Sequence, residues 1–461
     1  MRRKTTVGEV DADVLDYTAG KDRVLDLALA AADCMGTAAH VTMLARVPVK
    51  PPLLEARHAR QIIAELREVY LDAAEGRFAI TLEDQDVHLA VERRLTERLG
   101  DVGKRVHVCR SRNDQIAVDL RLYAKVRLQE AIGAAAWLAR MLVALAQRHE
   151  KAPMVGRTHM QPAMPSSVGL WASAWAESLL DVFLLLQTAY DLNNRSPLGS
   201  AASYGVPVPI DRQLTSDLLG FARPVHNVLH ANQTRGKLEA IILSALGQVM
   251  LTLSRLAQDL IIFSMPEFGY FRIPAEFTTG SSIMPQKRNP DVLELLRAKA
   301  AKVLSHAHFV AEIVRASPSG YNRDLQEAKE PFLDGFELTI RSLRILAPLM
   351  AGLEVDEAAL RAAFTPDVFA TDRALELVAA GRPFRDAYHE VKAHLDQLAG
   401  QSPDEALAAK NHLGAPLGLD LAGMDAAARQ VESWVAGEKK LHAACRDRLL
   451  GLKSKKKART G

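Results

Sequence analysis

Apolar residues recur at every third or fourth position over long stretches of this chain, which is the spacing of one face of an α-helix. The longest stretch starts at Gln115 and continues for about 35 residues, which corresponds to a rod of roughly 50 Å. No stretch alternates apolar and polar residues for long enough to predict a sheet-based fold. The pattern predicts an all-α fold with a central bundle of five long helices, at residues 115–150, 165–193, 231–264, 290–315 and 330–349.

Shorter helical stretches flank the predicted bundle on both sides. Residues 22–44, 57–75 and 81–100 precede it, with Thr81 as the expected cap of the third helix. After residue 352, prolines and glycines break the pattern into shorter pieces. We therefore divide the subunit into three regions: an N-terminal helical domain (1–108), the central long-helix bundle domain (109–352), and a small C-terminal helical domain with a basic tail (353–461).

The predicted rods have faces rich in alanine and leucine, and aromatic residues make up only 5% of the chain. Extended rods of this kind have more apolar side surface than one subunit can cover. We therefore expect the chain to form oligomers.

Composition and charge narrow the class of protein. The 461 residues are 48% hydrophobic and 25% charged, as in an ordinary soluble globular protein of two or three domains. The net charge of +3 gives no support for nucleic-acid binding, and part of it lies in the lysine-rich tail at 453–461. No run approaches 18 uninterrupted apolar residues, and no apolar run follows the basic start. We therefore expect neither a membrane span nor a secretory signal.

The three cysteines, Cys34, Cys109 and Cys445, show no spacing typical of a disulfide framework or a zinc site. A reducing compartment fits this pattern, so we expect a cytoplasmic protein.

The most unusual composition lies between the third and fourth predicted rods, in TTGSSIMPQKRNP at residues 278–290. Gly280 allows backbone conformations closed to other residues, and Ser281 places a hydroxyl on the turn. Lys287 adds a compact positive charge, and Asn289 is the expected N-cap of the following helix. A serine loop beside a lysine and the positive end of a helix predicts an anion-binding site.

Three further joints between helices carry chemistry. CRSRNDQ (109–115) precedes the longest rod and offers hydrogen-bond donors suited to a carboxylate. GRTHMQP (156–162) places His159 in a proline-bounded loop, which favours a positioned acid or base over a structural histidine. YNRDLQEAKEP (321–331) holds both signs of charge and a tyrosine, which suits a zwitterionic ligand, although a solvated connector explains the composition equally well.

A second histidine, His88, lies on the predicted helix at 81–100, near Asp84 and Glu92. Its sequence context supports two interpretations equally: a satisfied surface histidine, or an active-site residue.

The four motifs, in this order, resemble those of a known family. GSSxMPxKxNP is similar to the signature of the fumarase/aspartase superfamily, and SRND with YNxDLQExKEP narrows the resemblance to the argininosuccinate lyase family. The resemblance covers residues 18–349 and implies a homotetramer whose active sites are each built from three subunits. It also implies an enzyme that cleaves argininosuccinate reversibly to arginine and fumarate, with no metal or organic cofactor.

The resemblance assigns roles to individual residues. Ser281 and His159 would exchange protons with the substrate, with Ser281 favoured as the base, although the sequence leaves the two roles open. Glu294 would orient or polarise His159 from another subunit, and Lys287 would meet negative charge as it develops. The succinyl carboxylates are expected on Ser111, Asn113, Thr158, Lys287 and Asn289. The arginine half is expected on Tyr321, Gln326, Lys329 and Arg235, and Thr18 falls where the family often has a serine contact.

Two departures from the family pattern bear on these roles. Val108 and Cys109 stand where the family often has a threonine–glycine pair, and larger side chains there could shift the loop. NQTRGKLE (232–239) replaces an acidic pattern, which leaves the role of Arg235 open.

Three alternatives remain at this point: another fumarate-releasing lyase, chiefly adenylosuccinate lyase; a non-catalytic, crystallin-like structural protein; and a helical scaffold without a small-molecule site. The intact Ser281, Lys287, Asn289 and His159 argue against loss of activity, and a scaffold would require all four motifs to be accidental.

Overall fold

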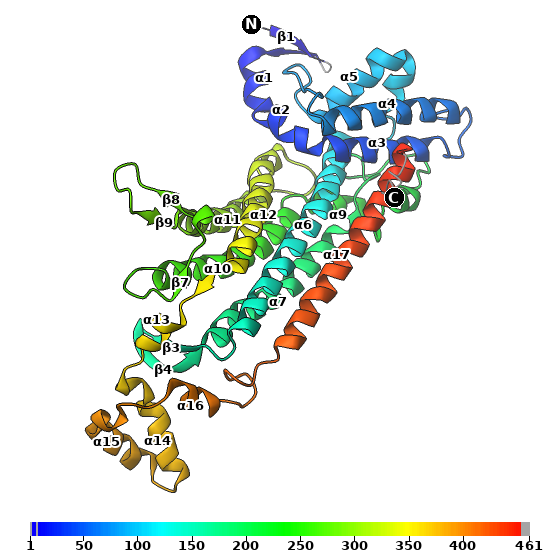
Figure 1. Cartoon of the computed structure of the whole chain (residues 1–461). Helices are drawn as coiled ribbons and strands as arrows, with labels where there is room; N and C mark the ends of the chain where they lie inside the picture. The colour runs from blue at the N-terminus through cyan, green and yellow to red at the C-terminus, as the bar shows by residue number, and fades with distance from the viewer. Residues whose placement is uncertain (1, 6–7, 453–461) are drawn as a thin grey trace, which may run out of the picture.

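The computed structural model describes residues 2–5 and 8–452, so the basic tail expected at 453–461 lies outside the described residues. Within that range the chain is mainly helical, and its strands form only two-stranded pairs. Figure 1 shows an elongated molecule, with long helices running side by side between an N-terminal group of helices at one end and a group of short helices at the other. The prediction of an all-α fold is confirmed.

Five long helices form the bundle, as predicted. They are α6 (Arg112–Arg148), α7 (Val168–Asn193), α10 (Lys237–Phe263), α11 (Asp291–Arg315) and α12 (Lys329–Ala351). One hydrophobic core runs through them and includes the fully buried Leu138, Leu179 and Leu253. Helices α10 and α12 pack so closely that a Cβ added to Gly335 would collide with the Leu243 side chain.

A sixth long helix, α17 (Leu421–Leu450), also packs along α6 and was not predicted. The guanidinium of Arg140 on α6 lies 3.0 Å from Glu432 on α17, and the Trp434 ring packs edge-on against Tyr190 with ring centroids 5.0 Å apart. The region 353–461 is therefore not only a small domain of short helices, because its last helix returns to the bundle. Small residues such as Ala428 and Gly437 along α17 weaken its periodic apolar signal.

The short helices of this region lie at the far end of the molecule (Figure 1). They are α13 (Glu357–Ala362), α14 (Ala370–Ala379), α15 (Phe384–Ala393) and α16 (Pro403–Ala408).

The N-terminal region consists of α1 (Ala12–Ala19), α2 (Asp22–Leu25), α3 (Ala30–Leu44), α4 (Ala56–Ala74) and α5 (Val87–Leu99). A 3₁₀ turn at Asp26–Leu29 interrupts the stretch predicted as one helix at 22–44. The predicted cap Thr81 is wrong, because Asp86 caps α5 by accepting a hydrogen bond from the Leu89 amide at 2.9 Å. The Thr81 hydroxyl instead donates to Asp84, also at 2.9 Å.

Most strand pairs occupy the joints between helices. The pairs are β1 (Arg2–Thr5) with β2 (Gly8–Asp11), β3 (Pro153–Thr158) with β4 (Gln161–Ser167), β5 (Arg195–Ser196) with β6 (Arg223–Pro224), β7 (Phe271–Arg272) with β10 (Glu354–Val355), and β8 (Thr279–Gly280) with β9 (Arg288–Asn289). Two short helices, α8 (Arg212–Leu218) and α9 (Val228–Gln233), complete the connection between α7 and α10.

Four helical stretches are long and apolar enough to cross a membrane by length and composition alone. They are Asp22–Leu44, Arg112–Arg148, Val168–Asn193 and Lys237–Phe263. Between 44% and 78% of the residues in their most apolar windows are buried inside the fold. Packing within the subunit therefore accounts for much of this apolar character, and the absence of a membrane span stays a prediction.

Helix α6 also buries a series of polar side chains: Asp114, Gln115, Asp119, Arg121, Lys125 and Gln129. The partners of Asp114, Arg121 and Lys125 lie on the segments that connect the other helices. The Lys125 ammonium donates to the side chain of Asn194 at 2.9 Å, and Arg121 donates to the Thr234 hydroxyl at 2.6 Å. Because a buried charge is unfavourable without such bonds, these contacts fix the connecting segments against α6.

One buried and one half-buried histidine, His40 and His442, make the fold sensitive to acid. Burial lowers the pKa of His40 to about 3 and the pKa of His442 to about 4. An unfolded chain has histidine pKa values near 6.5, so it binds more protons than the folded chain between these limits. Each neutral histidine therefore contributes fully to the free energy of unfolding above pH 6.5. That contribution is lost as the pH drops from 6.5 toward the pKa of the folded state.

We expect His442→Gln to reduce this acid sensitivity. Between pH 7 and pH 5 the variant should lose about 1–2 kcal/mol less unfolding free energy than the wild type, as measured by urea denaturation at the two pH values. The exposed His389, replaced in the same way, is the matched control and should leave the pH dependence unchanged. If His442→Gln and the wild type lose the same unfolding free energy between pH 7 and pH 5, the lowered pKa of His442 is not a source of the acid sensitivity.

Candidate active site

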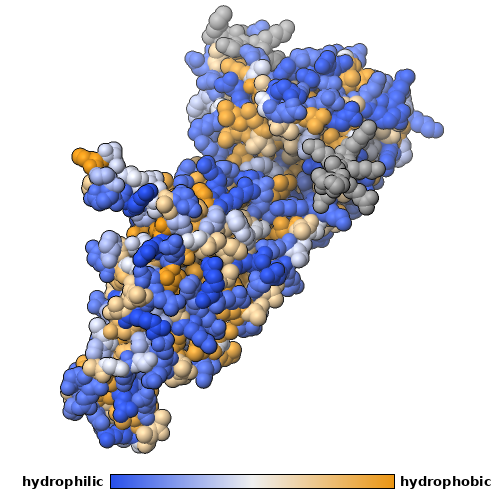
Figure 2. Space-filling view, in the orientation of Figure 1, coloured by the Kyte–Doolittle hydropathy of each residue, from blue (hydrophilic) through white to orange (hydrophobic). Residues whose placement is uncertain are grey.

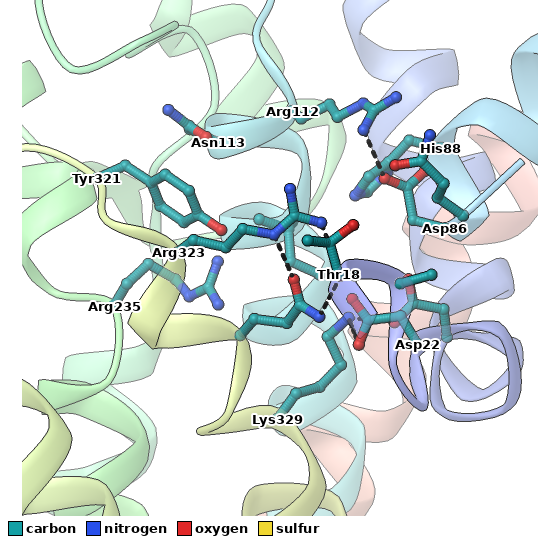
Figure 3. A pocket seen from close by; sticks show the side chains of 15 residues that line it. Thr18, Asp22, Asp86, His88, Arg112, Asn113, Arg235, Tyr321, Arg323 and Lys329 are labelled. Atoms are coloured by element: carbon teal, nitrogen blue, oxygen red, sulfur yellow. Dashed lines mark hydrogen bonds and ion pairs between the residues drawn. The ribbon is translucent and has the colours of Figure 1, made fainter. Parts of the chain in front are cut away.

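A cavity of about 150 Å³ lies where the N-terminal helices meet the bundle. Figure 3 shows side chains that converge on it from the N-terminal helices, the start of α6 and the segment before α12. Six of the predicted substrate contacts line this cavity: Thr18, Asn113, Arg235, Tyr321, Gln326 and Lys329. The structure therefore brings the motif at 109–115 and the motif at 321–331 to one site.

The floor of the cavity is an ion cluster around Lys329. Its ammonium lies 2.9 Å from Asp22 and 2.5 Å from Asp26, and its side chain is only 3% exposed. Burial raises the pKa of Asp22, and the positive charge of Lys329 opposes that rise. The ammonium is therefore already paired, and the three groups together present both signs of charge to a ligand.

The segment that carries Tyr321 is docked onto the end of α1. The side chains of Gln326 and Arg323 donate to the backbone carbonyl of Thr18 at 3.0 and 2.7 Å. The hydroxyl of Thr18 donates to the Val14 carbonyl within its own helix, at 2.7 Å. Thr18 thus lines the cavity, and the group it gives to this segment is its carbonyl oxygen.

Arg235 lines the cavity although the sequence around it departs from the family pattern. It is 5% exposed, and its Nε donates to Glu239 at 3.2 Å. Its Nη1 is buried without a hydrogen-bond partner among the described residues. A buried guanidinium nitrogen without a partner is unfavourable, and because Nη1 is fully enclosed, a ligand could reach it only if the surrounding side chains moved.

Asp114 fixes the start of α6, where Ser111 and Asn113 stand. The Ser111 hydroxyl accepts from the Asn113 amide at 3.2 Å, and Asp114 Oδ1 accepts from the Ser111 amide at 2.8 Å. This reciprocal arrangement is a capping box. The other oxygen of Asp114 accepts from the amides of Gly199 and Ala201, both at 3.0 Å. Asp114 therefore ties α6 to the loop at residues 196–212.

Cys109, just before this motif, has a φ of 61°. This is the left-handed region that a glycine, often found here in the family, adopts without strain. The loop therefore keeps a left-handed residue at Cys109, at a cost of roughly 1–2 kcal/mol.

Thr158 and His159 lie on the β3–β4 hairpin, at the end of the bundle away from the N-terminal helices (Figure 1). The turn consists of His159 and Met160, with φ values of 53° and 64°, so both residues have the left-handed backbone of a tight hairpin turn. The guanidinium of Arg157 stacks over the Phe268 ring at 4.9 Å, which anchors the hairpin. Both Thr158 and His159 are exposed in the single chain.

Ser281 and Lys287 lie on a hairpin between β8 and β9 that projects from the side of the bundle (Figure 1). The Ser281 Oγ accepts hydrogen bonds from the amides of Ile283 and Met284 at 3.3 and 3.1 Å. The Lys287 ammonium has no acidic partner within 4.0 Å among the described residues. Ser281 is half-buried, and Lys287 is exposed.

The start of α11 differs by one residue from the prediction. Asn289 pairs with Thr279 in the short β8–β9 ladder, and Pro290 is the N-cap, without a side-chain hydrogen bond. Glu294 lies in the first turn of α11 and is exposed. The predicted anion site therefore has the helix start and the lysine in place, but Asn289 does not cap the helix.

Within one chain, the predicted residues occupy three separate places: the cavity, the β3–β4 turn and the β8–β9 hairpin. Among the described residues, no contact joins His159 to Ser281, Lys287 or Glu294. A single subunit therefore does not assemble the predicted proton-transfer pair.

Several side chains that line the cavity were not among the predicted site residues: Asp22, Asp26, Gln85, Asp86, His88, Arg112 and Arg323. A dashed line in Figure 3 marks the ion pair between Arg112 and Asp86, whose closest atoms are 3.2 Å apart. Arg112 belongs to the SRND motif, and Asp86 lies two residues before His88. Both are therefore close in sequence to residues that the sequence analysis named as candidates. The two acids that hold Lys329 had no such local signal.

Three buried side chains behind the cavity, Asp33, His88 and Asp119, have donor atoms within 4.8 Å of one another, as metal ligands would. The Asp33 Oδ2 and His88 Nδ1 atoms are 2.6 Å apart, which is a hydrogen-bond distance. Two ligands of a tetrahedral zinc ion would lie about 3.3 Å apart. The geometry favours a shared proton, and the absence of a metal cofactor stays a prediction.

Comparison with known proteins gives consistent matches. A family model described as lyase matches residues 9–305. The argininosuccinate lyase of Parabacteroides distasonis is 44% identical over 393 residues, 85% of this chain and 87% of its own length. That of Sorangium cellulosum is 44% identical over 414 residues, 90% of this chain and 95% of its own. The solved structure of EDDS lyase in complex with formate matches with a TM-score of 0.80 over 96% of this chain and 95% of its own, at 23% identity, which shows a common fold.

We expect Asp114→Asn to weaken both the fold and ligand binding. The amide group cannot accept on its nitrogen, so one or more of the three backbone donors is left unpaired in a buried site, which costs about 1–3 kcal/mol. The variant should show a lower free energy of unfolding and a raised KM. Asp211→Asn is the control, because Asp211 is an exposed cap of α8 and asparagine caps equally well. Indistinguishable behaviour of the two variants would show that Asp114 does not hold the site.

Proposed function

The chain belongs to the argininosuccinate lyase family of the fumarase/aspartase superfamily and is an enzyme, a lyase; from that membership we propose that it cleaves argininosuccinate reversibly to arginine and fumarate. The observation that carries the proposal is that the four sequence motifs occur in a chain 44% identical to argininosuccinate lyases over most of its length. The same matches favour this substrate over that of adenylosuccinate lyase.

The reaction is an anti elimination. A base removes a proton from the carbon next to a carboxylate, negative charge spreads into that carboxylate, and the bond from carbon to the guanidino nitrogen breaks. The departing nitrogen then takes a proton from an acid. Fixed positive groups near the carboxylate lower the barrier because they meet the charge as it develops.

Ser281 is the base in this proposal. A free serine hydroxyl is a weak base near neutral pH, so its alkoxide needs stabilisation. The amides of Ile283 and Met284 already donate to its Oγ, and bonds of this kind favour the charged form. Lys287, on the same hairpin and without an acidic partner, is available both to this alkoxide and to the substrate carboxylate.

His159 is the acid, which protonates the departing nitrogen. The tight turn that holds it presents the imidazole at the tip of a hairpin, and both turn residues have the strained backbone that is common at functional sites. Glu294 would orient this imidazole from another subunit.

The cavity would hold the arginine half of the substrate and, at Asn113 in its lining, a carboxylate of the succinyl half. Its floor offers the charge pair of Lys329 with Asp22 and Asp26, and Tyr321 and Arg235 also line it. Arginine has a carboxylate, an amino group and a guanidinium, so a site with both signs of charge suits it.

We also propose a homotetramer in which the three places are completed by different subunits. Large apolar side chains are exposed along the long helices: Leu184, Leu185, Ile241, Leu251, Leu295, Phe309 and Ile345. A groove of about 640 Å³ beside Leu185 and Ile241 is lined mainly by apolar side chains. Exposed apolar surface of this extent is typical of an interface between subunits. A cytoplasmic enzyme that binds neither nucleic acid nor a membrane is part of the same proposal.

Ser281→Ala and His159→Asn should each reduce kcat for argininosuccinate by at least about 10²-fold, which is the usual scale of acid–base catalysis. Fumarate release measured by absorbance, with argininosuccinate and adenylosuccinate offered in turn, tests both the residues and the substrate. Ser282→Ala is the matched control because it removes a neighbouring hydroxyl from the same hairpin. Near-normal turnover in both test variants, or faster turnover of adenylosuccinate, would contradict the proposal.

Mixing inactive variants tests whether the sites are shared. If Ser281 and His159 act from different subunits, refolding Ser281→Ala together with His159→Asn should restore up to about a quarter of the wild-type sites. Ser281→Ala mixed with Lys287→Met is the control, because both residues lie on one hairpin and no subunit would carry both intact. Recovery in neither mixture, with each protein correctly assembled, would mean that the sites are not shared.

A further inference from the structure

Behind the cavity lies a buried cluster of charged side chains that the proposed mechanism does not use. Asp33 on α3, His88 on α5 and Asp119 on α6 are 1%, 6% and 1% exposed, and Arg110 beside them is 8% exposed. The cluster therefore joins two N-terminal helices to the first helix of the bundle. Among its members, only His88 lines the cavity.

The cluster holds the Nδ1 edge of the His88 ring. Its Nδ1 lies 2.6 Å from Asp33 Oδ2 and 3.6 Å from Asp119 Oδ2. The other oxygen of Asp33 is 3.4 Å from the Thr37 hydroxyl, which also accepts from Arg110 at 2.8 Å. A ring whose Nδ1 is fixed in this way has its Nε2 fixed as well, because the two nitrogens belong to one rigid plane.

The Nε2 atom of His88 remains available for a hydrogen bond to a ligand. It makes no hydrogen bond to any of the described residues, and it is not among the fully enclosed polar atoms that lack a partner. Figure 3 shows His88 beside Asp86 at the edge of the cavity, on the side where Arg112 and Asn113 begin α6. The acid closest in sequence, Asp86, is already paired with Arg112.

We propose that His88 is a second ligand-binding imidazole, which donates a hydrogen bond from Nε2 to a carboxylate of the substrate while Asp33 and Asp119 position it from behind. This inference rests on the proposed function for the identity of the substrate. The ligand group is a carboxylate because two carboxyl groups, Asp33 at 2.6 Å and Asp119 at 3.6 Å, face Nδ1 and favour a ring that carries a proton on both nitrogens, so Nε2 requires an acceptor.

The charges around the ring support the imidazolium form. Burial disfavours it, but the hydrogen bond and the negative charge of Asp33 outweigh burial and raise the pKa of His88. Burial, together with the charge of Asp33, raises the pKa of Asp119 well above its ordinary value. The cluster thus contains two carboxyl groups, Asp33 and Asp119, and two basic side chains, His88 and Arg110, so the positive charge of the ring is opposed by nearby negative charge.

Two substitutions separate ligand binding from a structural role. In His88→Asn the amide nitrogen falls near the position of Nδ1, so the bond to Asp33 is kept and the donor toward the cavity is lost. In His88→Gln the amide nitrogen falls near the position of Nε2, so the donor toward the cavity is kept and the bond to Asp33 is lost. The two roles therefore predict opposite results.

If His88 binds a carboxylate, His88→Asn should raise the Kd for fumarate, measured by isothermal titration calorimetry, about 10- to 100-fold with little change in Tm. The KM for argininosuccinate should rise with it. His88→Gln should bind fumarate within about threefold of the wild type and should have the lower Tm. Fumarate binding by His88→Asn equal to that of the wild type, or equal weakening in both variants, would overturn the proposal.

His40→Gln is the control for loss of a buried histidine. His40 is fully buried and bonds through Nε2 to the Val108 carbonyl at 2.8 Å, and it does not line the cavity. Its substitution should leave fumarate binding unchanged. A rise in Tm with added zinc that Asp119→Asn removes would show a metal site instead and would also overturn the proposal. Wild-type protein that binds fumarate but does not cleave argininosuccinate would refute the proposed function and leave the test of His88 intact.

Discussion

The structure depends on the pairing of charges that the long helices carry into the interior. Unpaired buried charges are strongly destabilising, so each buried charge requires a fixed partner. Those partners lie on other elements: Asp114 of α6 holds the amides of residues 199 and 201, Lys125 of α6 holds Asn194, and Lys329 of α12 holds α2. Hydrophobic packing aligns the rods, but these pairs define how the connecting segments sit on them.

The same constraint explains where the cavity lies and what it can bind. Where α6 and α12 meet the N-terminal helices, nearly every charge has a partner, as in Lys329 with Asp22 and Arg112 with Asp86. Among the described residues, the Nε2 atom of His88 is an exception, because it makes no hydrogen bond and is not fully enclosed. Unused donors in an otherwise paired surface mark the positions where a carboxylate completes the hydrogen bonding.

Much of the fold was predictable because long apolar stripes specify long helices, and the five bundle helices follow those stripes. The motifs between the helices were predictable as candidate functional sites because their glycines, prolines and polar residues are not typical of the interior of a helix. The partners of those motifs were not predictable: Asp26 and Lys329 are 303 residues apart, and no local pattern connects them. Likewise α17 carries small residues, such as Ala428 and Gly437, which weaken its apolar signal, and the start of α11 depends on a strand pair at Asn289 that its capping signal does not reveal.

The chemistry proposed for the β8–β9 hairpin requires that another surface cover it. Two amides favour an alkoxide at Ser281, but water at an exposed hydroxyl competes with them, so a serine base needs a covered site. The tip of the hairpin is hydrophobic in Figure 2, and Ile283 there is 82% exposed. An apolar side chain in this position is unfavourable in a lone subunit and favourable once a surface covers it. The energy gained by covering the tip would then also exclude water from Ser281, which links assembly of the site directly to the basicity that the reaction requires.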